Sequence, residues 1–411
     1  MCAAHTLQGM KVTAVVVRPT DRATLTLEVE VEVPSSTWFP DVAPVLDAMR
    51  DTYGIEAVVL TCLSDDPPTY LTCPLGEPPA DATWVYDRPI ASADLPAWTH
   101  PEWYDEAPQW IAQHVQATGP WSQIKSWGLS NVLRIPTADG DVYFKALAHS
   151  TTIKPVRPDA LPFLFAHEPL FLHRASADRP GEVPAPIAID ERRAWMLLRD
   201  LGTPLSDETD LAVWIDAVRR HARLQRSYAD QPERLLEFTC ADRRLAVLDA
   251  ELDRLLGPNP FTDRLGPAER DRLPERAKQL REAINELTAI GVPETLLHGD
   301  LHPRNLAVKD GRVLAFDWTD AALAHPFLDL VTFVEERSPL SREPEVRDAY
   351  LREWEEYATP AELQRAVELA EELGALYQVM TYLHLPDYLT GPSKESMYRG
   401  GVWWLRRLLA M

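Results

Sequence analysis

One segment constrains the fold of this chain more than any other: LLHGDLHPRNLAVKDGRVLAFDW, residues 296–318. It interrupts a part of the chain, beyond Leu201, whose apolar spacing is otherwise almost wholly helical. Two short strands, Leu306–Val308 and Val313–Phe316, flank the turn residues Lys309–Gly311. The segment therefore predicts a hairpin preceded by a polar loop.

Three polar residues of this segment have the types that phosphoryl transfer from ATP requires. The activation barrier of phosphoryl transfer is lowered mainly by positioning the reactants and neutralising charge. The reaction therefore needs a carboxylate that orients the acceptor and oxygen ligands for Mg²⁺. Asp300 lies in the loop, Asn305 follows five residues later, and Asp317 ends the second strand. The hairpin can bring Asn305 and Asp317 onto one metal ion, and their oxygens suit Mg²⁺.

The spacing H-x-D-x-x-x-x-N, followed by a hydrophobic strand that ends in Asp, is that of the catalytic segment in protein-kinase-like enzymes. In the form HGDLHPRN…FDW, with HPFLDLVTF after it, the segment resembles the aminoglycoside phosphotransferase and choline kinase group. Upstream, SWGLSNVLRIPTADGDVYFKA is similar to that group's phosphate loop, hairpin and strand lysine, and FAHEPLFLHR to its glutamate-bearing helix. The resemblance covers residues 106–335. It implies an α+β, bilobal protein-kinase-like fold with a β-rich N-lobe and a helical C-lobe.

The resemblance also implies residue roles. Asp300 would accept or orient the proton of the attacking hydroxyl, while Asn305 and Asp317 would hold Mg²⁺. Lys145 would contact the α- and β-phosphates of ATP or GTP, and Glu168 would pair with it. The resemblance further implies a phosphate-covering loop with Gly128, Ser130 and Asn131, and an adenine-contacting linker at Met196–Arg199 that includes Met196 and Leu198. Val308 and Phe316 would form the floor of the nucleotide site. Asp329 and His298 would support the catalytic loop.

The sequence departs from related patterns in ways that narrow the function. The loop GLSN is not G-x-G-x-x-G, and no G-x-x-x-x-G-K-[ST] occurs, which excludes a P-loop as the phosphate site. The metal motif reads DWT, and no A-P-E segment follows, which argues against a protein substrate. The alternative is a nucleotide-binding pseudokinase or regulatory module whose N-terminal domain carries the function. Retention of Lys145, Asp300, Asn305 and Asp317 argues against it.

Pro169 follows Glu168 directly, within the helical spacing of Leu161–Ala175. Proline is tolerated in the first turn of a helix, so we expect this helix to start near Glu168.

The first hundred residues predict a small α+β domain that precedes the two lobes. Strands are expected at Lys11–Arg18, Ala23–Val33 and Glu56–Leu63, and a helix at Asp41–Tyr53. A stretch dense in Pro and Asp follows, with turns, short strands and a linker. The expected domains are an N-terminal domain (1–105), an N-lobe (106–200) and a helical C-lobe with the catalytic loop (201–411).

One part of this domain, PVLDAMRDTYGIEAVVL, resembles the helix and following strand of Nudix hydrolases. The catalytic box of those enzymes needs several glutamates on the helix, whereas here only Asp47 and Asp51 are acidic. We therefore expect either an inactive Nudix-like domain or an unrelated α+β domain.

Charge limits the partners. The chain has 63 acidic and 41 basic side chains, for a net charge of −22. Such a chain repels nucleic acids and anionic membranes, and no apolar run approaches the ~20 residues of a membrane-spanning helix. Its start lacks the pattern of a signal peptide, so a cytoplasmic protein is expected. The acidic surplus weakly favours a cationic small-molecule acceptor among the aminoglycoside-like, amino alcohol and sugar hydroxyls that stay open, and it says nothing about oligomeric state.

Overall fold

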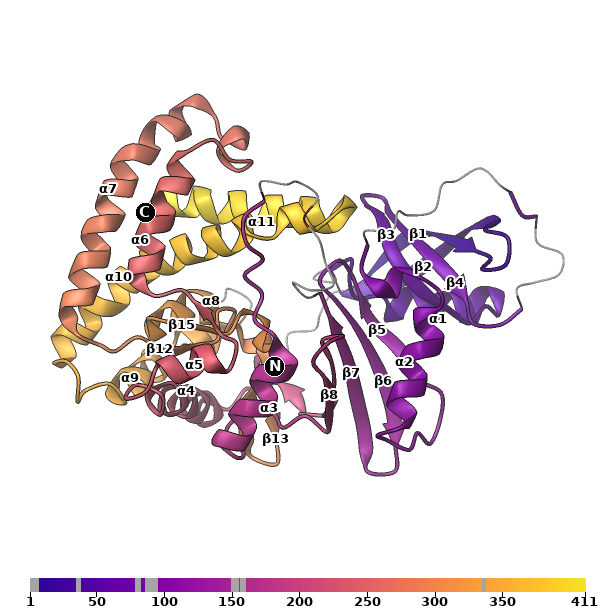
Figure 1. Ribbon diagram of the computed structural model, residues 1–411, viewed down its shortest axis with the longest axis horizontal. Coiled ribbons are helices and arrows are strands. Elements are labelled where there is room, and N and C mark those ends of the chain that lie inside the picture. The colour runs from indigo at the N-terminus through magenta and orange to yellow at the C-terminus, as the bar shows by residue number, and fades with distance from the viewer. Residues whose placement is uncertain are drawn as a thin grey trace. The chain divides into compact units, whose positions relative to one another are not determined.

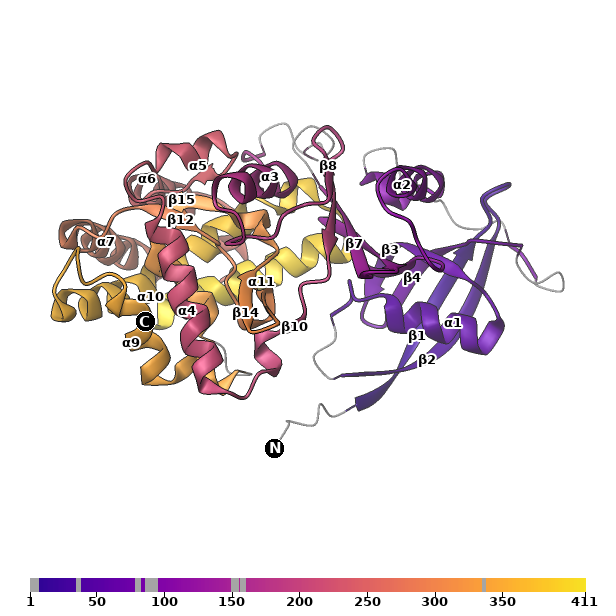
Figure 2. The same cartoon turned by 90° about the horizontal axis from the view of Figure 1, so that it is seen from below.

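The computed structural model describes residues 7–34, 38–77, 83–85, 95–148, 155, 160–334 and 338–411. The chain divides into two compact units, whose elements Figures 1 and 2 label. Unit 1 comprises Met1–Pro158, Ile187–Asp200 and Asp387–Ser396, and unit 2 comprises Asp159–Pro186, Leu201–Pro386 and Met397–Met411. Unit 1 holds the large sheets and unit 2 holds most of the helices, as the sequence predicted. The proposed domain boundary near residue 105 lies inside unit 1 and stays a prediction.

The N-terminal part of unit 1 is a four-stranded sheet with one helix, α1 (Ala43–Tyr53), against it. The strand order is β2-β1-β4-β3, and β1 and β4 are parallel while the other neighbours are antiparallel. Alternate apolar residues of β1 and β2, such as Val12 and Val31, pack with Met49 of α1 in one core. The predicted strands and helix are confirmed, and β4 joins them in the middle of the sheet. The strands are β1 (Leu7–Val17), β2 (Thr24–Pro34), β3 (Ala57–Asp65) and β4 (Pro68–Pro74).

The second sheet of unit 1 has the strand order β5-β6-β7-β9-β8. Helix α2 (Trp103–Ala112) covers one face, where its Trp103 and Trp110 contact Phe144 and Trp195. The helix begins and ends earlier than the Glu106–Thr118 that spacing predicted. The β6–β7 hairpin is confirmed at the expected turn. The strands are β5 (Ser122–Ser126), β6 (Ser130–Thr137), β7 (Gly140–Leu147), β8 (Ala188–Asp190) and β9 (Trp195–Arg199).

Unit 2 is built on helices around two small sheets, ordered β10-β13-β14 and β11-β15-β12. Its long helices α7 and α10 pack against each other (Figure 1). No helix in the described part of the chain is long and apolar enough to cross a membrane. The helices are α3 (Glu168–Asp178), α4 (Leu211–Arg226), α5 (Glu233–Glu237), α6 (Leu245–Leu256), α7 (Pro267–Ile290), α8 (Leu330–Phe333), α9 (Pro344–Arg352), α10 (Pro360–Leu383) and α11 (Gly391–Ala410), whose first residues belong to unit 1. The strands are β10 (Thr203–Pro204), β11 (Ala241–Asp242), β12 (Thr295–Leu297), β13 (Leu306–Lys309), β14 (Arg312–Ala315) and β15 (Ala322–Ala324).

Two local predictions were wrong and a third was confirmed. Apolar spacing predicts a single helix over Glu233–Leu256. The structure instead breaks it between α5 and α6, because β11 leaves the helical path to pair with β15 and Thr239 takes a positive φ of 75°. The start of α3 at Glu168, expected from Pro169, is confirmed, and Pro169 lies in the first turn of the helix. Residues Met196–Arg199, expected as a linker, instead form most of β9, since β7 and β8 both pair with them.

Candidate active site

Residues 296–318 form the predicted loop and hairpin in unit 2. β13 and β14 pair from Leu306 opposite Ala315 to Lys309 opposite Arg312. The ladder continues one step outward, because the Phe316 N–H donates to the Asn305 carbonyl at 2.9 Å. The paired ends of the two strands therefore bring Asn305 close to the backbone that leads into Asp317, as the sequence predicted.

Asp300 lies on the loop between β12 and this hairpin, and hydrogen bonds fix its backbone. Its carbonyl accepts from the His302 N–H at 2.9 Å and from Asn305 Nδ2 at 3.0 Å. Its side chain is 45% exposed, with His302 Nε2 at 3.5 Å from Oδ2. The carboxylate is thus accessible to a small molecule while its backbone is held.

His298 links the loop to the strand that ends before Asp317. Burial lowers the pKa of His298 to about 4, so the imidazole is neutral near pH 7. Its Nε2 donates to the Phe316 carbonyl at 2.9 Å, which leaves Nδ1 to accept from the Asp300 N–H at 3.3 Å. One neutral tautomer satisfies both bonds. The ring thus joins Asp300 to the residue before Asp317, and the structural role expected for this histidine agrees with the bonding.

Asp329 lies beneath the same loop, fully buried. Its Oδ1 accepts from the Gly299 N–H at 2.8 Å, and its Oδ2 accepts from the His298 N–H at 3.0 Å. Two side chains of α4 also bind Oδ2: His221 Nε2 at 2.9 Å and Gln225 Nε2 at 3.0 Å. Four hydrogen bonds on one carboxylate hold the loop against α4, which is the arrangement that a supporting role for Asp329 requires.

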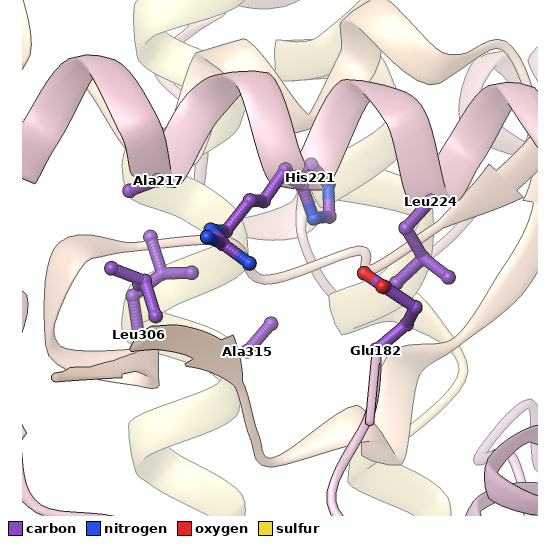
Figure 3. Close-up of a pocket in the computed structure, with 8 residues that line it drawn as sticks. Glu182, Ala217, His221, Leu224, Leu306 and Ala315 are labelled. Atoms are coloured by element: carbon purple, nitrogen blue, oxygen red, sulfur yellow. The ribbon is translucent and has the colours of Figure 1, made fainter. Parts of the chain in front are cut away.

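A small cavity lies behind the hairpin, between α4 and the two strands (Figure 3). Its volume of about 10 Å³ is room for about one water molecule, so it is too small for a nucleotide or an acceptor. The lining residues are Glu182, Ala217, Arg220, His221, Leu224, Leu306, Val313 and Ala315.

Three carboxylates gather where the loop and the hairpin meet. Asp317 has left-handed backbone angles, φ 62° and ψ 56°, and the Thr319 hydroxyl lies 3.3 Å from Asp317 Oδ1 and 3.1 Å from Asp320 Oδ2. Burial, together with the negative charges of Asp300 and Asp317, raises the pKa of Asp320 to about 7. Gly299 permits this approach, because a Cβ on its positive-φ backbone would lie 2.6 Å from the Asp320 carbonyl oxygen.

This donor set fits Mg²⁺. Among the residues that the structure describes, no group of three or more His, Cys, Asp or Glu side chains is arranged to hold a metal ion. Magnesium needs fewer protein ligands, since it is commonly held by one or two side chains and otherwise by phosphates and water. Asn305 Nδ2 is engaged by the Asp300 carbonyl, so its amide oxygen is the atom suited to a cation, beside the crowded negative charge of the aspartates.

Glu168 begins α3 and is fully buried. Its Oε1 accepts from the Trp318 N–H at 2.8 Å, so it holds the residue directly after Asp317. Its expected partner, Lys145, belongs to the other compact unit, and the pair stays a prediction.

Lys145 lies on β7, in the middle of the five-stranded sheet. It is opposite Val132 of β6 and Met196 of β9, so these three side chains share one face. The neighbouring Phe144 points to the other face, which α2 covers. Leu198, opposite Tyr143, shares the face of Lys145. The nucleotide contacts proposed for Lys145, Met196, Leu198, Val308 and Phe316 stay predictions.

The turn between β5 and β6 carries the expected phosphate loop. The side chains of Ser130 and Asn131 are buried, and both are hydrogen-bonded within the protein. Ser130 Oγ accepts from the Trp127 indole at 2.9 Å, and Asn131 Nδ2 donates to Tyr104 Oη at 3.1 Å. These side chains shape the turn, so any phosphate contact would come from its backbone. The Gly128 N–H donates to Ser393 Oγ at 3.1 Å.

Sequence reasoning missed several residues of the site. Asp320 could have been proposed from the sequence, because it is a second carboxylate only three residues after Asp317. His221 and Gln225 carried none, because they lie on an ordinary helix more than a hundred positions before Asp329. Gln378 of α10, whose Nε2 donates to the Gly299 carbonyl at 2.7 Å, was equally hidden.

Comparison with solved structures supports the expected fold. A choline/ethanolamine kinase family protein from Mesorhizobium loti superposes with a TM-score of 0.51 at 18% identity, covering 75% of this chain and 95% of that chain. The aminoglycoside phosphotransferase APH(4)-Ia gives a TM-score of 0.50 at 11% identity, covering 75% of this chain and 97% of that chain. The bilobal, protein-kinase-like architecture is thereby confirmed. No match was found among curated protein sequences.

The sequence model of the phosphotransferase enzyme family matches residues 157–369. This range contains Glu168, Asp300, Asn305 and Asp317, and it begins after Lys145. Because the matched range is just over half of the 411 residues, the chain belongs to the phosphotransferase enzyme family.

Proposed function

We propose that the protein transfers the γ-phosphate of ATP or GTP to a hydroxyl group of a small molecule, with Mg²⁺ as cofactor. One observation carries this proposal: the accessible carboxylate of Asp300 lies on a loop that is hydrogen-bonded to Asn305 and, through His298, to the strand before Asp317. Membership of the phosphotransferase enzyme family supports the reaction type.

Each residue has a definite task in this reaction. Asp300 orients the acceptor hydroxyl and takes its proton as the new O–P bond forms and the bond to the leaving nucleoside diphosphate breaks. Asn305 and Asp317 would hold Mg²⁺, which neutralises phosphate charge when bound. Glu168 fixes the backbone after Asp317, and Lys145 contacts the remaining phosphates.

The charge of the chain and the names of similar structures favour a cationic acceptor. The net charge is −22, and Asp320 adds a third carboxylate beside Asp300 and Asp317. The two similar structures are named for choline or ethanolamine and for aminoglycosides, which all carry amino or quaternary ammonium groups together with hydroxyl groups. An amino alcohol or aminoglycoside-like hydroxyl is therefore the proposed acceptor class.

A nucleotide-consumption screen tests the proposal. Purified protein with Mg²⁺ and ATP or GTP is offered amino alcohols, aminoglycosides, sugars and homoserine-like alcohols, with the Asp300→Asn variant as control. We expect wild-type consumption above background with one class and none with the variant. Mg²⁺-dependent nucleotide binding without transfer to any acceptor or to water would instead support the pseudokinase alternative.

A further inference from the structure

The first sheet of unit 1 makes an unusual junction with the second. β3 is an edge strand of the first sheet, and side chains bind both the backbone N–H and the carbonyl of its Val59. The Val59 N–H donates to Gln123 Oε1 at 2.7 Å, and the Val59 carbonyl accepts from Gln123 Nε2 at 3.0 Å. A single glutamine of β5 thus makes both bonds that a neighbouring strand would otherwise supply.

The same carbonyl binds the residues next to the turn at 127–130. Ser126 Oγ donates to the Val59 carbonyl at 3.0 Å, and Tyr104 Oη donates to it at 3.2 Å. Across the turn, Asn131 Nδ2 donates to Tyr104 Oη at 3.1 Å and to Ser126 Oγ at 3.3 Å. Ser126 and Asn131 are both 0% exposed, so loss of these bonds would leave buried polar groups unpaired. Both ends of the turn are therefore tied to the Val59 carbonyl of the N-terminal sheet, Ser126 directly and Asn131 through Tyr104.

The turn itself also contacts the N-terminal part of unit 1. Trp127 packs against the core of the first sheet, and its ring meets that of Trp38 edge-on at 4.6 Å. The segment that carries Trp38 runs alongside β5, where the Ser126 N–H donates to the Pro40 carbonyl at 2.9 Å. Lys125 lies over the Trp38 ring at 5.6 Å. The turn is thus held at its two ends and through the side chain of Trp127.

We propose that the N-terminal domain positions the turn at 127–130 for nucleotide binding. The inference rests on the proposed function, with this turn as the phosphate-covering loop that the family resemblance implies. A loop that is already held in its binding conformation loses less entropy on binding, so its anchors contribute to nucleotide affinity without touching the nucleotide. Trp38 is accordingly a positioning residue that acts through Trp127.

Trp38→Ala is the direct test, because Trp38 is 36% exposed and its loss leaves the buried bonds around Val59 intact. Loss of this edge-on aromatic pair should raise the Kd for the non-hydrolysable analogue AMP-PNP and the KM for ATP by about 2- to 10-fold. The KM for the acceptor should not change. Trp38→Phe keeps a ring against Trp127 and should restore most of the affinity.

Trp403→Ala is the matched control. Trp403 is a 56% exposed tryptophan in the part of α11 that belongs to unit 2, and its removal should leave the Kd for AMP-PNP unchanged. A wild-type Kd in Trp38→Ala would overturn this inference alone, as would an equal rise in both KM values together with a lowered thermal midpoint. Absence of AMP-PNP binding by the wild-type protein would overturn the proposed function as well.

Discussion

Asp329→Asn should destabilise unit 2 and slow the reaction, although the two side chains have nearly the same size. The carboxylate accepts four hydrogen bonds, three on Oδ2 and one on Oδ1. If the amide oxygen of Asn replaces Oδ2, the amide nitrogen faces the Gly299 N–H, and an unpaired buried N–H costs about 1–3 kcal/mol. The other three bonds lose their charge assistance, at about 1 kcal/mol each. The sum is about 5 kcal/mol.

Thermal denaturation and steady-state kinetics measure the two effects. For a unit of this size, about 5 kcal/mol lowers the melting temperature by about 10–20 °C. Displacement of the loop that carries Asp300 should also reduce kcat, by as much as ~10²-fold for a shift near 1 Å. Asp348→Asn, at a 56% exposed side chain of α9, is the control and should change stability by less than about 0.5 kcal/mol. An Asp329→Asn variant with the melting temperature and kcat of the wild type would refute this reasoning.

Three further predictions concern the same loop and hairpin. Gly299→Ala should lower the free energy of unfolding, measured by urea denaturation, by at least ~2 kcal/mol. Ala at φ +85° is strained, and its Cβ would lie 2.6 Å from the Asp320 carbonyl oxygen. An unchanged urea midpoint would contradict this prediction. Burial lowers the pKa of His298 from 6.5 to about 4, so between these values the unfolded chain binds a proton that the folded chain does not, and stability falls as the pH falls. Between pH 7 and pH 5, His298→Gln should therefore lose about 2 kcal/mol less folding stability than the wild type. Equal losses of stability would disprove the lowered pKa of His298. Asn305→Ala should raise the Mg²⁺ concentration for half-maximal activity by at least ~10-fold, whereas an unaltered Mg²⁺ titration would remove Asn305 from the metal site.

The β13–β14 hairpin could be predicted from sequence because its determinants are local. A three-residue turn between two short apolar strands fixes the pairing of β13 and β14, and that pairing carries Asn305 toward Asp317. The start of α3 at Glu168 was equally readable, since proline is tolerated in the first turn of a helix and costs stability in its interior.

What the sequence could not predict depends on contacts between distant positions. The break between α5 and α6 exists because β11 pairs with β15 about eighty residues later, and no local pattern marks it. The hydrogen bonds of His221 and Gln225 to Asp329 span 108 and 104 positions, and those of Gln123 to Val59 span 64. Such partners become visible only when the fold brings them together.

The central claim is that Asp300 is the residue that prepares the acceptor hydroxyl, and its most direct test is phosphate transfer by Asp300→Asn. With the acceptor found in the screen, the account predicts that the variant binds AMP-PNP with the affinity of the wild type while its kcat falls by ~10²-fold or more. Full turnover by Asp300→Asn would contradict the account.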